Sequence, residues 1–415
     1  MNLNNTPFMA WSLVGFSLCL LVPGTAQVQK YLGNTGVALY MPIAFSALLI
    51  SYRSLLPRFL TRVTEKDAVW LAAITYVALI AVFAIVYPIA DSGIVGGGSD
   101  RDDAIDVSTN ALIRGRYPYY AKSYQGYPTH VLPGSLFLAI PFVLLGKSAY
   151  QNFLWLPVFF VVTKRYLGNW RLALPLLWAM LLLSPSVLHE LVVGGDLISN
   201  SVYVLVFMRF MVNSVPDPNQ SGWKKWLAAV LLGVGLSSRA NFILLLPLVF
   251  STLVQRAGWK SAIKYTAVTC VTLGGVTIPF FLYDPPGFFP FNALGIIAQF
   301  KPMLPFAGAV LPLLGGIIAV ALSLRRMDSD DLVLLKSSAI VQAFLVVSAV
   351  ALYTIHAGSL DLSRMGYGLL FLFFGGLACW VDLVPKVTMA APANATGVPV
   401  HQIGIDSELR PMSQE

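Results

Sequence analysis

Charged side chains are scarce in this sequence: Asp, Glu, Lys and Arg together make up 11% of its 415 residues. In a soluble domain about a quarter of the residues are charged, so this composition argues against a soluble fold. Apolar residues make up 57% and occur in runs along nearly the whole chain. A run of about 20 apolar residues is what one helix needs to cross a bilayer. The sequence therefore predicts an integral, multi-pass membrane protein.

Cysteine and histidine are also rare, with 3 and 4 residues. Cys19, Cys270 and Cys379 lie far apart in apolar runs, without the spacing of a disulfide framework or a metal site. We interpret them as small buried side chains and predict no metal site from them. The net charge of +8 comes from short Lys/Arg clusters between apolar runs, as in the turns of membrane proteins. We therefore expect membrane lipids as partners and no nucleic acid.

Spans in a bilayer must satisfy their own backbone hydrogen bonds, which favours helices. We predict an all-α, polytopic transmembrane helix bundle of about 11–13 spans, with a short amphipathic helix in its first large extracytoplasmic loop. Residues 1–385 form the membrane domain, 91–130 its extracytoplasmic acidic loop, and 386–415 a C-terminal tail whose Ala, Pro and polar content predicts disorder. The predicted spans are 9–22, 37–52, 68–90, 131–146, 149–162, 172–188, 197–212, 227–236, 240–254, 262–282, 306–324, 332–355 and 365–383.

Basic turns set the predicted orientation, because cytoplasmic turns carry an excess of Lys and Arg. A basic stretch follows the second predicted span, and three Lys/Arg pairs lie between later ones. With these turns in the cytoplasm, residues 91–130 lie on the extracytoplasmic side. The basic turns contain Arg53, Arg58, Arg62, Lys66, Lys164, Arg165, Lys224, Lys225, Arg325 and Arg326.

One pair of predicted spans conflicts with this orientation. If 131–146 and 149–162 both cross the bilayer, Lys164 and Arg165 fall outside the cytoplasm. Pro133 and Pro141 interrupt the first of these runs. A re-entrant or interfacial segment at 131–146 would restore the charge rule.

The loop at 96–120 has the sequence GGGSDRDDAIDVSTNALIRGRYPYY. Ser99 followed by Asp102 is a capping-box pattern, and Gly115 is placed to end a helix. We expect a short amphipathic helix over 100–114 that lies on the membrane surface. Its apolar face would carry Ile105, Ser108 and Leu112, and its other face Asp102, Asp103 and Asp106.

Four carboxylates, at positions 100, 102, 103 and 106, occur within this helix. Carboxylates that lie close together raise each other's pKa, which prepares one of them to act as a general base. Carboxylate oxygens are also ligands for a divalent cation, so such a cation is a candidate cofactor. The alternative is that these are solvated acids at a helix N-terminus, where they favour the helix dipole.

The loop resembles the first extracytoplasmic loop of the GT-C superfamily of membrane glycosyltransferases. The similarity consists of Asp100 after an early span, the small-residue and Leu pattern at 110–115, and the aromatic-Pro elements at 117–119 and 127–128. The bacterial group that uses polyprenol-phosphate-mannose is the most similar. Weaker similarity at 184–200 and 233–241 extends the resemblance to about residues 96–250.

The resemblance implies an inverting glycosyltransferase in a bacterial inner (plasma) membrane. Such an enzyme moves a sugar, mannose or a similar hexose or pentose, from a polyprenyl-phosphate donor to a lipid or glycan acceptor. A loop Asp acts as general base. By spacing to Gly115, Asp100 matches best, then Asp103, then Asp102, and the extra acids leave this register open.

Residues outside the acidic loop are candidates for binding the donor phosphate or the substrate. Arg239 lies inside an apolar hairpin, where an Arg is costly unless it is paired. A polar cluster after the span at 172–188 is expected on the same side as the acidic loop, where it either binds sugar hydroxyls or forms a solvated turn. The further candidates are His189, Glu190 and Asp196 in this cluster, and His356 and Arg364 in the last extracytoplasmic loop.

A membrane transporter or lipid flippase is the alternative function. It predicts charges within the spans and internal repeat symmetry. Here the predicted spans are mostly free of charge, and the acids collect in one loop. The sequence therefore favours the transferase.

Overall fold

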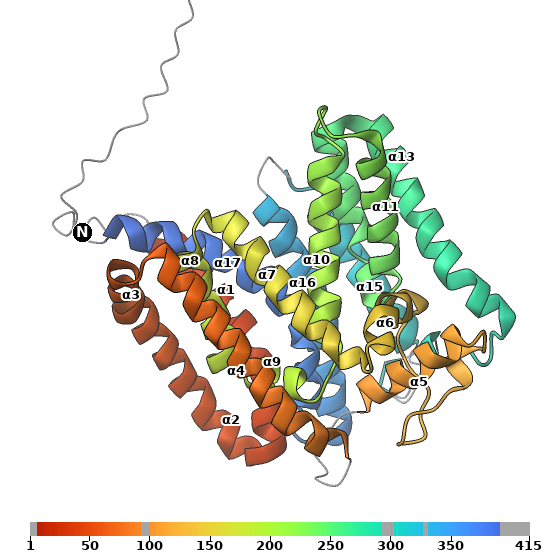
Figure 1. Ribbon diagram of the computed structural model, residues 1–415, viewed down its shortest axis with the longest axis horizontal. Coiled ribbons are helices and arrows are strands. Elements are labelled where there is room, and N and C mark those ends of the chain that lie inside the picture. Colours follow the sequence, from red (N-terminus) through yellow and green to blue (C-terminus); the bar gives the residue numbers. More distant parts are fainter. Residues whose placement is uncertain are drawn as a thin grey trace, which may run out of the picture.

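The computed structural model describes residues 6–92, 100–291, 300, 303–304, 306–326 and 331–390. All regular structure in these residues is helical, apart from one isolated β-bridge between Lys122 and Pro128. This confirms the predicted all-α polytopic bundle (Figure 1). The α-helices are α1 (Thr6–Leu21), α2 (Thr25–Ile50), α3 (Leu56–Arg62), α4 (Glu65–Asp91), α5 (Arg101–Ile113), α6 (Pro133–Leu144), α7 (Gln151–Leu167), α8 (Trp170–Leu183), α9 (Pro185–Val192), α10 (Leu197–Ser214), α11 (Gly222–Leu236), α12 (Ala240–Ile243), α13 (Leu246–Tyr283), α15 (Ala307–Ser323), α16 (Asp331–Ala357) and α17 (Leu369–Ala390).

Six helical segments of the described chain are long and apolar enough to cross a membrane, or up to 8 if each of two bent helix pairs is one span. The protein is therefore a multi-pass membrane protein, but the predicted number of about 11–13 spans is higher. Two of the six segments, Ala10–Arg62 and Ala240–Tyr283, have 53 and 44 residues and exceed the length of one crossing. Gly33 and Gly258 break the helical backbone inside them. Other predicted spans correspond to short helices such as α11, which has 15 residues.

Two predicted spans are bent. α6 has 12 residues and meets the following helical segment at 97°, so residues 131–146 make no separate full crossing. The predicted span at 172–188 breaks between α8 and α9, which meet at 82°. Pro185 begins α9, because its ring and missing N–H prevent α8 from continuing. α17 also extends to Ala390, past the predicted start of the tail, and residues 391–415 lie outside the described part.

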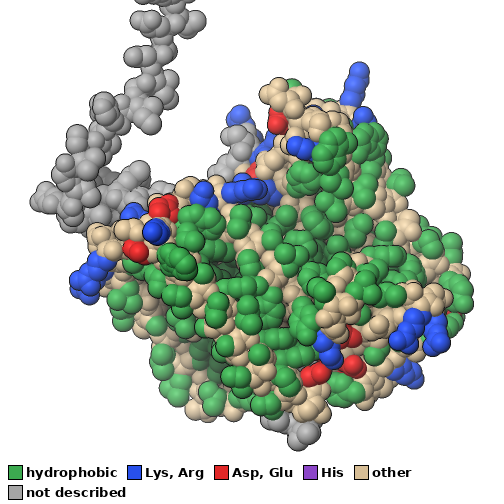
Figure 2. All heavy atoms as spheres, in the orientation of Figure 1, with side chains coloured by type: hydrophobic (Ala, Val, Ile, Leu, Met, Phe, Trp, Pro, Cys, Tyr) green, Lys and Arg blue, Asp and Glu red, His purple; other side chains and the backbone are tan. Residues whose placement is uncertain are grey.

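α10 lies at the centre of the bundle and packs against α7, α11 and α17 (Figure 1). Nearly all of its residues are buried. Its N-terminus lies at the lower end of the bundle, where α5 also lies, and the turn from α10 to α11 lies at the upper end. Figure 2 shows Lys and Arg side chains at this upper end and further ones at the lower right.

The N-terminus of α6 is joined to the turn after α11. The Leu132 and Gly134 N–H groups donate to the carbonyls of Ser238 and Ser237, at 3.0 and 2.9 Å. A Cβ atom on Gly134 would lie 2.2 Å from the Val234 carbonyl oxygen. This contact holds the loop that precedes α6 close to Arg239.

Gly134→Ala is expected to destabilise the fold by about 1–3 kcal/mol, because the backbone of α11 cannot move away from the added methyl group without losing these hydrogen bonds. The measurement is unfolding of the purified protein in mixed detergent micelles. Gly222→Ala is the matched control, since nothing lies within 4 Å of a Cβ atom there. Equal stability of the two variants would contradict the close packing at Gly134.

Candidate functional site

α5 ends as predicted, in a turn at Gly115. Gly115 has a φ of 68°, and the N–H groups of Arg116 and Gly115 donate to the carbonyls of Ala111 and Leu112 at 2.8 and 3.0 Å. This is a Schellman motif, which requires a left-handed residue that glycine supplies without strain. At the other end, Ser99 of the predicted capping box lies outside the described residues. Asp100 occupies the N-cap and makes no side-chain capping hydrogen bond.

The predicted division of α5 into an apolar and an acidic face is wrong, because Asp102 and Asp106 are buried on the same side as Ile105. The Tyr87 hydroxyl donates to Asp102 Oδ2 at 2.6 Å. The Ser148 N–H donates to Asp106 Oδ1 at 2.7 Å, and Lys147 Nζ lies 3.7 Å from Asp106 Oδ2. These partners from α4 and from the turn before α7 offset part of the cost of taking the carboxylates out of water. α5 is therefore part of the protein core, not a helix lying free on the membrane.

The other two carboxylates of the loop have separate partners. Asp103 Oδ2 accepts the Tyr124 N–H at 2.8 Å, and Asp100 Oδ2 accepts the Ser123 hydroxyl at 2.6 Å. The four acids thus do not converge on one point. Among the described residues, no group of three or more His, Cys, Asp or Glu side chains is arranged to hold a metal ion. The described part of the chain thus offers no ligand set for the divalent cation considered above.

Asp100 borders two neighbouring cavities, and Arg101 and Tyr367 line both of them as well. The larger has a volume of about 630 Å³. The smaller, of about 100 Å³, is lined by Thr129, His130 and Arg239 among others. The further polar and charged side chains of the larger cavity are Gln27, Gln29, Lys30, Gln125, Ser186, His189, Glu190, Ser363 and Arg364.

A network of two arginines and two buried acids lines these cavities. Arg101 forms an ion pair with Glu190. Arg239 Nη2 lies 2.7 and 2.5 Å from the two carboxylate oxygens of Asp196, and Arg101 Nη1 lies 4.0 Å from Asp196. The structure therefore brings together four residues that lie far apart in the sequence, three of which were predicted as site residues. Arg101 is the fourth, and it was not among the predicted residues.

Asp196 remains ionised in this network. Complete burial alone would raise its pKa, but the guanidinium groups of Arg239 and Arg101 and the Asn200 amide hold the pKa below its ordinary value. The charges of the two arginines are thus matched by two carboxylates. Arg239 was the first candidate for binding the donor phosphate, and in this structure it forms an ion pair with Asp196.

Cations that are not part of this network line the larger cavity at Lys30 and Arg364. Arg364 was predicted, and its guanidinium stacks over the Tyr353 ring at 4.7 Å. Lys30 was not among the predicted site residues. It is the only charged residue between positions 6 and 52, and a single cation inside an apolar stretch of a membrane protein is a candidate functional residue. His356 is exposed, contacts the Phe300 ring at 5.4 Å and lines neither cavity.

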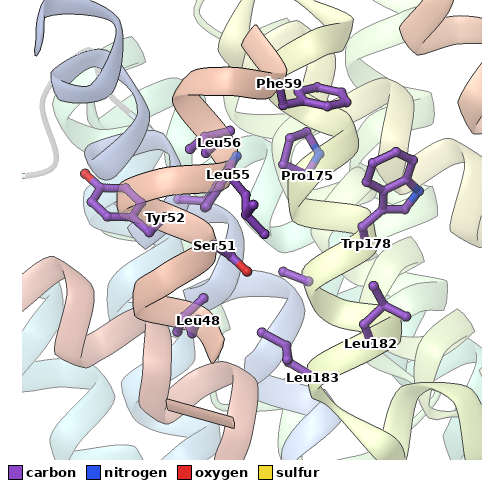
Figure 3. A pocket seen from close by; sticks show the side chains of 12 residues that line it. Leu48, Ser51, Tyr52, Leu55, Leu56, Phe59, Pro175, Trp178, Leu182 and Leu183 are labelled. Atoms are coloured by element: carbon purple, nitrogen blue, oxygen red, sulfur yellow. The ribbon is translucent and has the colours of Figure 1, made fainter. Parts of the chain in front are cut away.

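A third cavity, of about 250 Å³, lies between α2–α3 and α8 (Figure 3). A π-helical turn at Ser51–Leu55 forms part of its wall. The polar atoms of its aromatic side chains are used elsewhere: the Tyr52 hydroxyl donates to the Leu383 carbonyl, and the Trp178 indole N–H to Thr75. No charged side chain lines this cavity, so the candidate site is the pair of cavities at Asp100.

Stability is expected to fall as pH rises from about 4 to 7, because burial, with Asp91 and Asp106 nearby, raises the pKa of Asp102 to about 7. The Tyr87 hydrogen bond opposes this shift only in part. A carboxyl whose pKa is higher in the folded than in the unfolded protein stabilises the fold while it holds its proton, and this contribution is lost as pH rises through the folded pKa. The loss is on the order of 4 kcal/mol at most.

The measurement is the unfolding midpoint of wild type and Asp102→Asn between pH 4 and 8. Asn keeps an oxygen for the Tyr87 hydroxyl but carries no titrating proton, so the difference between the two proteins should change in favour of the variant as pH rises. Parallel pH curves would show that Asp102 does not titrate in this range.

No family model, no curated protein and no solved structure matches this chain. Function is therefore argued from the geometry and chemistry of the two cavities at Asp100.

Proposed function

We propose that this protein is a membrane glycosyltransferase that moves a sugar from a polyprenyl-phosphate donor to a lipid or glycan acceptor of the cell envelope. The observation that carries the proposal is the place of Asp100. Its carboxylate borders both cavities, at the end of the bundle opposite the basic turns. A bacterial inner membrane, with this end on the extracytoplasmic side, is the setting we infer.

The larger cavity suits the sugar-phosphate head of the donor. Its volume of about 630 Å³ falls within the range of about 300–1,000 Å³ that small-molecule sites occupy. Lys30 and Arg364 supply cationic groups for the phosphate, because charge-assisted hydrogen bonds to phosphate oxygens are strong. The amides of Gln27 and Gln125 supply donors and acceptors for sugar hydroxyls, whereas the Gln29 amide is bonded to Asn34, Leu360 and Leu362.

The smaller cavity, which also contains Asp100, offers a position for the acceptor hydroxyl. Asp100 takes the proton of this hydroxyl as its oxygen bonds to the anomeric carbon. The bond from the anomeric carbon to the phosphate oxygen breaks, and polyprenyl phosphate leaves with the electron pair. The anomeric configuration inverts in this single displacement. Arg101, held by Glu190, lies beside the reacting groups and is placed to orient the phosphate.

The test compares the lipid and glycan profiles of cells that lack the protein, by mass spectrometry, after wild type or Asp100→Asn is restored at matched expression. We expect the deletion to lose a species that is one sugar heavier than its precursor. Wild type should restore it and Asp100→Asn should not. The mass difference then identifies the sugar as a hexose or a pentose.

Asp217→Asn is the matched control, because Asp217 lies in the turn between α10 and α11, at the opposite end of the bundle. It should restore the species as wild type does. If the deletion changes no glycan or glycolipid, the transferase is refuted, and a transporter or flippase becomes the leading function.

A further inference from the structure

A separate recess of about 280 Å³ lies where the C-terminal end of α5 meets the last turn of α13. Leu112, Pro279 and Phe280 are among its apolar lining residues, and Arg116, Tyr117 and Tyr283 are its larger polar ones. It shares no lining residue with the two cavities at Asp100. A ligand in this recess therefore contacts none of the residues that line those cavities.

Tyr117 fixes the wall of this recess. Its hydroxyl donates to the Phe280 carbonyl at 2.9 Å, and its ring stacks on the Tyr283 ring with centroids 4.9 Å apart. The Phe280 carbonyl is one of the last four of α13, which have no N–H partner inside the helix. A hydrogen bond therefore joins the loop after α5 to the last turn of α13 at this recess.

Arg116 gives the recess a positive charge that no acid of the described chain neutralises. Arg116 is exposed and forms no ion pair among these residues, and the same is true of Arg114 and Lys122. The nearby Asp284 accepts instead from the Tyr120 hydroxyl at 2.8 Å. Figure 2 shows Lys and Arg side chains at the lower right, around the end of α5 in Figure 1. The positive-inside rule does not account for cations at this end of the bundle.

The other side of the recess continues into the apolar surface of α13. Ile278, Leu282 and Tyr283 are 52, 68 and 70% exposed, and they belong to a helical segment that is long and apolar enough to cross a membrane. In a span, exposed apolar side chains of this kind face lipid chains. We therefore expect the recess at the border between hydrocarbon and water, with Pro279 and Phe280 toward the hydrocarbon and Arg116 toward the water.

We propose that this recess binds an anionic phospholipid, with its phosphate on Arg116 and one acyl chain along Pro279 and Phe280. A cation at the membrane surface attracts an anionic headgroup, and the apolar lining excludes water from the chain below it. Among the occupants that fit an apolar recess with a cationic edge, only a lipid supplies both parts from the surrounding bilayer.

The test is native mass spectrometry of the purified full-length protein in detergent, titrated with phosphatidylglycerol or with phosphatidylcholine of the same acyl chains. Wild type should bind phosphatidylglycerol more tightly. Arg116→Gln should weaken the first phosphatidylglycerol by about fivefold and leave phosphatidylcholine binding unchanged.

Lys122→Gln is the matched control, because Lys122 is also exposed and unpaired at this end but does not line the recess. Its effect should stay below about twofold if the headgroup is held locally. Equal losses in both variants would overturn the proposal in favour of diffuse attraction to a basic surface. Equal binding of the two lipids by wild type would overturn it in favour of an apolar site with no headgroup contact. Unchanged unfolding midpoints without added lipid would confirm that neither variant is misfolded.

Discussion

Asp100→Asn is expected to slow sugar transfer by about 10²–10⁴-fold, which is the usual contribution of a general base. The asparagine retains an oxygen that accepts the Ser123 hydroxyl, so the loop should stay in place. It cannot take the acceptor proton. The KM for the donor should therefore change little while kcat falls. The measurement is transfer from a labelled polyprenyl-phosphate sugar to membranes of the deletion strain.

Asp102→Asn and Asp103→Asn decide between the three acids that the sequence leaves as candidates for the base. Asp102 is 1% exposed and lines neither cavity, and Asp103 accepts a backbone N–H from Tyr124. Both variants should keep transfer rates within about tenfold of wild type, since a residue away from the reacting groups contributes no proton transfer. If Asp103→Asn loses as much as is expected for Asp100→Asn, while Asp100→Asn remains active, the base is Asp103.

Asp196→Ala is expected to destabilise the protein by about 3–5 kcal/mol, the usual cost of breaking a buried ion pair by removing one partner. Arg239 would be left with a buried guanidinium and only distant acids. The Asn200 amide, which donates to Asp196 at 2.6 Å, would also lose its acceptor. The measurement is the free energy of unfolding in mixed micelles at pH 7.

The double variant Asp196→Leu with Arg239→Met isolates the cause of this loss. Removing both charges leaves no buried ion without a partner, so the double variant should be more stable than Asp196→Ala. Arg101 keeps Glu190 as its partner in both proteins, and both lose the Asp196 carboxylate 4.0 Å away, so this loss does not distinguish them. If the double variant is as unstable as the single one, the loss comes from packing and not from the unpaired charge.

The sequence predicted those parts of the fold that depend on local patterns. The end of α5 at Gly115 was predictable because a left-handed residue after a helix is a local requirement. The need of Arg239 for a partner was also predictable, because an unpaired Arg in apolar surroundings is energetically costly. Its partner was harder to name, because Asp196 lies 43 positions away and only the packing of α11 against α10 brings the two together.

Other features depended on contacts that no local pattern contains. The burial of Asp102 rests on the Tyr87 hydroxyl of α4, and that of Asp106 on the Ser148 N–H. A helical period shows only which residues share a face of α5, not which face meets protein. The number of spans was overestimated because the apolar runs at 131–146 and 149–162 form one bent pair of helices, and because other runs form helices too short to cross a bilayer, such as α11 with 15 residues.

The network of Arg101, Glu190, Asp196 and Arg239 has a consequence for biogenesis. Arg101 precedes α6, Glu190 lies in α9, Asp196 directly precedes α10 and Arg239 follows α11, so the nascent chain must reach Arg239 before the last charge is matched. Until then, Asp196 has no strong counter-ion and an early insertion intermediate carries an acid that is expensive to bury. A chain truncated before residue 239 should therefore be a substrate for membrane quality control.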